Sequence, residues 1–147
     1  YKFKFANARI FALLGPMLPL NVHFAAGNFI HNVLKMKKIV IKGSGKPIRS
    51  YLYPTDLVLW ILFLLLDNDA TGSFNLGSKE DISICDLADM IAKKYHTSFN
   101  IENKDDKGWN TSRYVPDNEK IISCSGINQS VFLDEAIQRT YQWNKEL

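Results

Sequence analysis

An arginine within a short apolar and aromatic segment is the residue of this chain best suited to chemistry. Arg49 follows a glycine turn at residues 43–45 and opens a segment, residues 49–53, that we expect to be a strand. A rigidly held guanidinium can donate two parallel hydrogen bonds to two anionic oxygens, such as those of a diphosphate. The same pattern also fits an edge-strand arginine that is exposed to solvent. The segment alone leaves both interpretations open.

The histidines and cysteines lack the spacing of catalytic or metal-binding clusters. His23 falls in a predicted loop, while His31 and His96 fall on or at the end of predicted helices, where a cation suits the helix dipole. Cys85 and Cys124 each lie in a predicted helix, with no Cys-x-x-Cys pair and no Cys/His cluster. The sequence therefore favours neither zinc nor a disulfide framework, and the cysteine usage fits a reducing cytoplasm.

The sequence also lacks the loops and pairs that handle dinucleotide cofactors. No glycine-rich phosphate loop is present, and Gly43-x-Gly45 leads into a strand rather than a helix. Tyr141 and Lys145 have the Tyr-x-x-x-Lys spacing of an acid/base pair, but they fall on the last predicted helix without partner residues. The residues alone therefore indicate neither a dinucleotide phosphate loop nor a Tyr/Lys acid–base pair.

The composition narrows the class of protein. The 147 residues are 46% hydrophobic and 22% charged, with a net charge of +3. This is enough chain for one domain with its own core. The small positive charge suits an anionic ligand, whereas no dense tract of lysine and arginine indicates nucleic acid.

The most apolar segment, residues 57–66, raises the question of a membrane. Its length is about half of the ~20 residues that a helix needs to span a bilayer. We therefore expect a helix buried on most of its circumference, and we find no signal peptide. The chain begins without methionine in front of a predicted buried strand, residues 5–14, so we expect a piece of a longer protein.

The spacing of apolar residues and turn formers predicts a mixture of strands and helices. The predicted strands are residues 5–14, 39–41, 49–53, 72–77 and 98–101. The predicted helices are residues 28–37, a helix capped by Thr55 that ends near Asp67, a helix opened by a Ser83–Asp86 capping box, residues 117–124 and residues 133–143. The polar segment 102–111 is expected to be mobile or gated by a ligand. The fold class is therefore α/β, with strands too short to form a large sheet by themselves.

Seven segments follow one another in a characteristic order along nearly the whole chain. They are Ala8–Pro16, Gly27–Ile30, Ile39–Gly45, Arg49–Leu57, Phe74–Ile84, Arg113–Lys120, and Gly126 with Leu133–Ile137. The fourth is similar to the pattern R-x-(F/Y)-x-(Y/H)-V-x-D-L, and the sixth to R-Y-x-x-D-x-x-K. In this order and with these gaps, they resemble the C-terminal part of the extended short-chain dehydrogenase/reductases that act on nucleotide sugars. These are the NAD-dependent sugar epimerases, dehydratases and decarboxylases.

The resemblance implies an α/β substrate-binding part with small mixed sheets and helices, in which residues 1–147 form a single domain. The NAD-binding Rossmann half, with the catalytic residues, would precede it and is missing from this chain. The implied ligand is a nucleotide-diphosphate sugar, and the implied setting is cytoplasmic carbohydrate metabolism without nucleic acid or membrane. A homodimeric parent enzyme remains open, and the chain alone is not expected to be active.

Two residues match positions that the family uses on the phosphates, and a third stands beside one of them. Arg49 occupies the position of the arginine that grips the diphosphate, and Tyr51 stands two residues later on the same strand face. Asn28 occupies the position of an asparagine whose amide helps to hold the phosphates. Taken by themselves, Asn28 also fits a helix cap and Tyr51 a core aromatic.

Four further residues match less specific positions. Val40 and Lys42 correspond to positions whose backbone flanks the base. Arg113 is the second candidate cation, and Lys107 stands in the place of a further arginine in the preceding loop. Solvated surface charges are the alternative interpretation of Arg113 and Lys107.

Three departures from the family pattern leave the sugar and the reaction open. Ala12 stands where the family usually has asparagine, Leu14 where it has tyrosine, and Ile127 where it has tryptophan. The alternative function, from another class, is a non-catalytic nucleotide-sugar or dinucleotide-binding module that acts as sensor or scaffold. A small interaction domain that uses the apolar face of residues 57–66 is a third interpretation.

Overall fold

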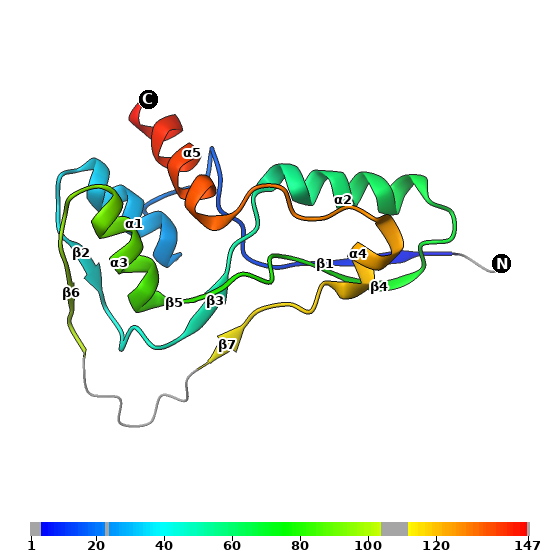
Figure 1. Ribbon diagram of the computed structural model, residues 1–147, viewed down its shortest axis with the longest axis horizontal. Helices are drawn as coiled ribbons and strands as arrows, with labels where there is room; N and C mark the ends of the chain where they lie inside the picture. The colour runs from blue at the N-terminus through cyan, green and yellow to red at the C-terminus, as the bar shows by residue number, and fades with distance from the viewer. Residues whose placement is uncertain (1–3, 23, 104–111, 147) are drawn as a thin grey trace.

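The computed structural model describes residues 4–22, 24–103 and 112–146, which form a mixed α/β fold (Figure 1). Its helices are α1 (Ala25–Leu34), α2 (Pro54–Leu66), α3 (Ile84–Lys94), α4 (Glu119–Ser125) and α5 (Leu133–Lys145). Its strands are β1 (Ala6–Ile10), β2 (Ile39–Ile41), β3 (Ile48–Ser50), β4 (Gly72–Leu76), β5 (Asp81–Ser83), β6 (Phe99–Ile101) and β7 (Arg113–Tyr114). The predicted α/β class is confirmed.

The strands of the described residues form three separate small sheets. β1 pairs with β4, and β2 pairs with β6, in both cases in parallel. In the third sheet β3 is the central strand, antiparallel to β5 and parallel to β7. Figure 1 shows α1 and α3 at the end that carries β2 and β6, and α2 and α4 at the end that carries β1 and β4. The sheet of β3, β5 and β7 lies between these two ends.

Two hydrophobic clusters, here named core A and core B, hold the structure together. The buried residues of core A are Leu14, Leu20, Ala26, Phe29, Ile30, Ile39, Ile41, Tyr51, Tyr53, Leu87, Ala88, Ile91, Ala92, Val131, Leu133, Ala136 and Ile137. The buried residues of core B are Leu52, Leu57, Trp60, Phe74, Leu76 and Ile121. Core A therefore joins α1, α3 and α5 to β2, and core B packs α2 and α4 against β4.

The predicted bounds of the elements agree with the structure at some positions and miss it at others. β2 matches the predicted residues, whereas α1 begins three residues before the predicted start at residue 28. The prediction of Thr55 as a cap is wrong, because α2 begins at Pro54 and Thr55 lies in its first turn. Proline has a fixed helical φ and lacks an N–H that the first turn would leave unpaired, so it takes the first helical position.

The capping box at the start of α3 is confirmed for one of its two hydrogen bonds. The backbone N–H of Asp86 donates to the Ser83 hydroxyl at 3.0 Å. The carboxylate of Asp86 accepts the Ser83 hydroxyl itself at 2.6 Å. Aspartate is one methylene shorter than the glutamate that usually reaches back to the cap backbone, which accounts for this nearer partner.

The prediction of a long buried first strand is wrong in both length and burial. β1 ends at Ile10, and all five of its residues are exposed. Beyond it, Leu13 forms an isolated bridge with Leu52. Within the described residues β1 pairs only with β4, so its other edge remains open and its faces are not covered.

The prediction that residues 57–66 form a helix buried on most of its circumference is also wrong. Only Asp56, Leu57 and Trp60 of α2 are buried. The exposed apolar residues of α2 are Val58, Leu59, Leu62, Leu65 and Leu66. No helix among the described residues combines the length and the apolar character that a membrane span needs. α2 therefore has an inner face on core B and an outer apolar face on the surface.

Candidate functional site

Arg49 lies in β3, and its guanidinium is held by neutral oxygens. Nη1 donates to the carbonyl of Ile48 at 2.7 Å and to the carbonyl of Ser112 at 2.9 Å. Nη2 donates to the Ser112 hydroxyl at 3.1 Å. Because β3 has β5 on one side and β7 on the other, Arg49 is not an edge-strand arginine. The side chain is half-buried and fixed at three points.

The glycine turn before β3 is anchored to the start of α3. Gly45 has φ of +78°, and a Cβ at this position would lie 3.1 Å from the Cβ of Cys85. Its carbonyl accepts the backbone N–H of Cys85 at 2.9 Å. Glycine is favoured here by the left-handed backbone and, in addition, by the close approach to Cys85. The turn therefore sets where β3, and with it Arg49, begins.

Tyr51 follows β3 and belongs to core A, with 4% of its surface exposed. Burial raises the pKa of its hydroxyl to about 12, while the positive charge of Arg49 acts in the opposite direction. The phenol is therefore neutral near pH 7, and it lies close enough to the guanidinium to sense its charge. Its burial fits the core-aromatic interpretation, and a contact with ligand stays a prediction.

Asn28 ties the loop before α1 to the helix. Its Nδ2 donates to the carbonyl of Val22 at 2.8 Å. The cap position of α1 is taken by Phe24, so Asn28 is not the cap. The side chain is half-buried, and its role on phosphates stays a prediction.

Val40 lies in β2, and Lys42 is the first residue after this strand. Val40 pairs in register with Asn100 of β6. The carbonyl of Lys42 accepts the Nδ2 of Asn103 at 2.8 Å, while its side chain is exposed. The backbone here is thus partly engaged within the protein, and a contact with a nucleotide base stays a prediction.

Arg113 lies on the opposite face of the sheet from Arg49. In the parallel pairing of β3 with β7, Tyr114 stands opposite Arg49, and Arg113 stands opposite Ile48. Side chains alternate between the two faces along a strand, so the two arginines project to different sides. Nη2 of Arg113 lies 3.0 Å from a carboxylate oxygen of Asp81. The structure therefore does not bring the two candidate cations together.

Lys107, and most of the polar segment 102–111, lie outside the described residues. Both expectations for this segment, a ligand-binding cation and a mobile or ligand-gated loop, stay predictions.

Ser112 is the residue at Arg49 that sequence reasoning missed. It comes immediately before the R-Y motif, two residues from Tyr114, so a period of two places it on the same face as Arg49. That signal has meaning only once β7 is known to pair with β3. No local pattern in the sequence predicts the pairing of β7 with β3.

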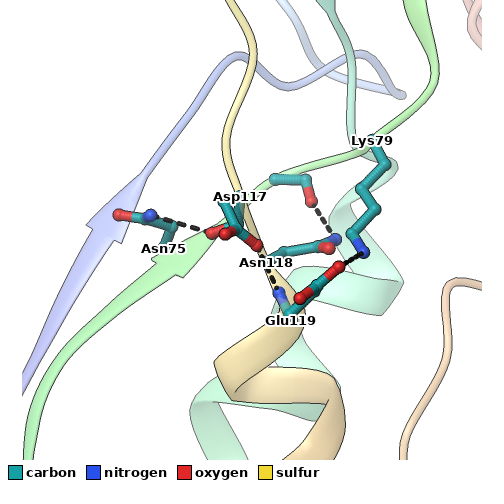
Figure 2. A network of polar contacts seen from close by, with 6 residues as sticks. Asn75, Lys79, Asp117, Asn118 and Glu119 are labelled. Carbon is teal, nitrogen blue, oxygen red and sulfur yellow. Dashed lines mark hydrogen bonds and ion pairs between the residues drawn. The ribbon is translucent and has the colours of Figure 1, made fainter.

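The R-Y-x-x-D-x-x-K segment is tied to the end of β4 by amide and carboxylate groups (Figure 2). Asn75 donates to the carbonyl of Asp117, and Asn118 donates to the carbonyl of Gly77, both at 2.8 Å. The carboxylate of Asp117 accepts the backbone N–H of Glu119 at 2.9 Å, at the start of α4. The prediction that Asp117 caps this short helix is wrong by one residue, because Asn118 holds the cap position and Asp117 accepts the first helical N–H from one position earlier.

Lys120, the last residue of the same motif, also serves the fold. Its Nζ donates to the carbonyls of Thr71 and Ser73, both at 3.1 Å. It also lies 4.0 Å from the centre of the Phe74 ring, in cation–π distance. The charged residues at the end of this motif thus dock α4 on β4.

The described residues form no group of three His, Cys, Asp or Glu side chains that could hold a metal ion. The glycine turn leads into β3 rather than into a helix, so it does not supply the helix N-terminus of a dinucleotide phosphate loop. Cys85 in α3 and Cys124 in α4 are both free, and both lie on helices as predicted.

The family of the chain follows from comparison with known proteins. A family model described as the NAD dependent epimerase/dehydratase family matches residues 1–77, or 77 of the 147 residues. The chain belongs to this family. The resemblance to extended short-chain dehydrogenase/reductases that was inferred from the ordered motifs is confirmed.

Curated relatives include UDP-glucuronic acid decarboxylases. The Danio rerio UDP-glucuronic acid decarboxylase 1 is 31% identical over 140 residues, covering 92% of this chain and 32% of the relative. The Arabidopsis thaliana UDP-glucuronic acid decarboxylase 1 is 29% identical over 132 residues, covering 90% of this chain and 30% of the relative. The chain thus spans about a third of the length of these curated relatives.

Solved structures of an epimerase and a dehydratase have the same fold. The UDP-glucose 4-epimerase of Thermotoga maritima, solved with UDP-glucose, has a TM-score of 0.83 at 18% identity, over 97% of this chain and 46% of that chain. The dTDP-glucose 4,6-dehydratase of Bacillus anthracis, solved with NAD, has a TM-score of 0.82 at 19% identity, over 96% and 44%. The expected α/β fold of part of an extended short-chain dehydrogenase/reductase is therefore confirmed.

Proposed function

We propose that this chain binds the nucleotide-diphosphate part of a nucleotide sugar, as the C-terminal portion of an NAD-dependent sugar-nucleotide epimerase/dehydratase. The observation that carries the proposal is Arg49, a cation fixed on a central strand by neutral partners. A guanidinium fixed in this way can bind two oxygens of a diphosphate at once. The relatives named for UDP-glucuronic acid and the structure solved with UDP-glucose support this ligand class.

In such an enzyme, this portion contributes binding energy far from the reacting carbon. The nucleotide diphosphate is gripped here so that the sugar ring is held in place for reaction. NAD, when bound, supplies the hydride chemistry, and the proposal assigns it mainly to an N-terminal domain. The residues of this chain bind and orient the substrate.

Residues 1–147 would form one substrate-binding domain that packs against that N-terminal NAD-binding domain. Two observations support this arrangement. β1 has an open edge and exposed faces, and α2 has an outer face of exposed leucines. The curated relatives are about three times as long as the chain, which leaves room for such a domain.

The test is Arg49→Ala in the complete parent protein, with Arg113→Ala on the other face of the sheet as the matched control. Loss of a charged hydrogen bond should cost about 1.5–3 kcal/mol of transition-state stabilisation. This corresponds to a decrease in kcat/KM of roughly 10- to 150-fold. Calorimetry of the 147-residue chain with UDP should show a corresponding loss of affinity. Unchanged kinetics and unchanged UDP affinity in Arg49→Ala would contradict the proposal.

A further inference from the structure

Ser112 contributes both of its oxygens to the β3–Arg49 region. Its carbonyl accepts the backbone N–H of Ile48 at 2.9 Å and the Nη1 of Arg49 at 2.9 Å. Its hydroxyl accepts the Nη2 of Arg49 at 3.1 Å. A carbonyl oxygen has two lone pairs, so it can accept both bonds. One residue therefore joins the pairing of β3 with β7 to the orientation of the guanidinium.

The geometry of these bonds leaves one edge of the guanidinium open. Five N–H donors project from this planar group in fixed directions. Because Ser112 receives bonds from both Nη1 and Nη2, it occupies the end of the fork, and the Ile48 carbonyl takes the other Nη1 hydrogen. Among the residues that the structure describes, this leaves the Nε–H and the second Nη2–H without an acceptor. These two donors are parallel and can bind two anionic oxygens together.

Arg49 and Arg113 also differ in whether their positive charge is already paired with an anion. All of the described acceptors of Arg49 are neutral oxygens, from Ile48 and Ser112. Arg113, on the other face, is paired with the carboxylate of Asp81. A cation held by neutral groups retains more attraction for an anionic ligand than one that is already ion-paired.

We infer that Ser112 is a positioning residue, which presents the Nε/Nη2 edge of Arg49 to the diphosphate of the ligand. The inference rests on the proposed function, because it deepens the role of Arg49 in that site. Ser112 acts through Arg49 by holding the end of its fork. Without the Ser112 hydroxyl, Nη2 exchanges its fixed partner for water, and the open edge loses its fixed direction.

The first test compares Ser112→Ala with Ser112→Thr in the 147-residue chain, with UDP as the probe in calorimetry. Ser112→Ala should weaken UDP binding by about 5- to 10-fold, the worth of one hydrogen bond, and Ser112→Thr should restore it. In an Arg49→Lys background, Ser112→Ala should have no further effect, because an ammonium has no fork to orient. Wild-type affinity in Ser112→Ala, or the same loss in the Arg49→Lys background, would overturn the inference.

Arg49→Ala separates this inference from the proposed function. If Arg49→Ala retains the affinity for UDP, the proposed function fails. If Arg49→Ala loses affinity and Ser112→Ala does not, the proposed function survives and the positioning role of Ser112 is wrong.

A second measurement needs no ligand. Nitrogen-15 NMR of the Arg49 side chain in the free chain should show slow rotation of the guanidinium in the wild type and in Ser112→Thr. Rotation should be faster in Ser112→Ala. Equal rotation rates in folded wild-type and Ser112→Ala protein would overturn the inference, and a shift in melting temperature alone would not support it.

Discussion

Core A and core B differ in how completely their helices are packed. In core A, α1, α3 and α5 each turn one apolar side inward, and the buried residues of α3 recur at three- and four-residue spacing. In core B, α2 is apolar around its circumference, yet its inner face is small and centred on Trp60. Its outer face carries Leu62, Leu65 and Leu66, the last with 79% of its surface exposed.

The difference shows at which end of the molecule the apolar helix faces are buried within the chain. An amphipathic helix needs one packed neighbour, whereas a helix that is apolar on all sides has a second face to bury. Strand β1, whose five residues are all exposed, lies at the same end as α2 (Figure 1). The apolar faces of the helices in core A are therefore buried within the chain. The core B end has exposed apolar surface, and we propose that it packs against the N-terminal domain.

The largest expected effect contrasts the two faces of α2. Trp60 is fully buried and donates its indole N–H to the carbonyl of Ile127 at 3.0 Å. Trp60→Ala should lower the free energy of unfolding by about 3–5 kcal/mol. Leu62→Ala, on the exposed face, should change it by about 0.5 kcal/mol or less. Urea unfolding of both variants checks this, and equal losses would mean that the outer face is already buried in the isolated chain.

The next effect concerns the pH dependence of core A at its margin near Arg49. Burial holds the pKa of Tyr51 at about 12 in the folded state, so the unfolded chain loses this proton first as the pH rises. The contribution of Tyr51 to stability is therefore complete below about pH 10 and is lost between about pH 10 and 12. Its size is about 1–3 kcal/mol.

Tyr51→Phe should remove this part of the alkaline loss in urea unfolding measured from pH 9 to about pH 12. Tyr114→Phe, at an exposed tyrosine of β7, is the control that should keep it. An unchanged alkaline profile in Tyr51→Phe would show that the buried phenol does not account for the loss.

A smaller effect separates two lysines at the core B end. Lys120 donates to two backbone carbonyls and lies over the Phe74 ring, whereas Lys79 makes an exposed ion pair with Glu119 at 3.2 Å (Figure 2). Lys120→Met should cost about 1–2 kcal/mol of unfolding free energy, because one cation serves several acceptors. Lys79→Met should cost about 0–1 kcal/mol. Equal losses of unfolding free energy in the two variants would mean that Lys120 does not hold α4 on β4.

The smallest effect on stability is expected on the outer face of α2. The double change Leu62→Lys and Leu66→Lys should leave the unfolding free energy nearly unchanged, yet reduce the self-association of the isolated chain in sedimentation experiments. Met36→Lys, at an exposed apolar residue near core A, is the matched control and should not alter association. Equal self-association of the wild type and the double variant would mean that the outer face of α2 does not mediate contacts between chains.

Local elements were predicted where a few neighbouring residues decide the structure. Ile39-Val40-Ile41 forms β2 because β-branched residues favour extended backbone, and Ser83 opens α3 because its hydroxyl satisfies a first-turn N–H. The start of α2 was misplaced because Pro54 competes with Thr55 for the same turn, and proline is better suited to the first position.

Burial was predicted less well because it depends on what packs against a segment. The apolar runs of β1 and α2 read as buried, although the described residues cover only part of them. Likewise, Arg49 and Arg113 read as two cations of one site. The register of β3 with β7 puts them on opposite faces, which no spacing within either segment reveals.

The sequence by itself determined the α/β class, the order of the motifs and the Ser83 cap of α3, because each depends on residue types a few positions apart. Only the tertiary structure decided that Ser112, 63 residues away, holds the guanidinium, and that Asp81 neutralises the other arginine. It also decided which face of α2 is covered. The reason is that pairing of distant strands and packing of faces arise from contacts between segments, which a local pattern does not encode.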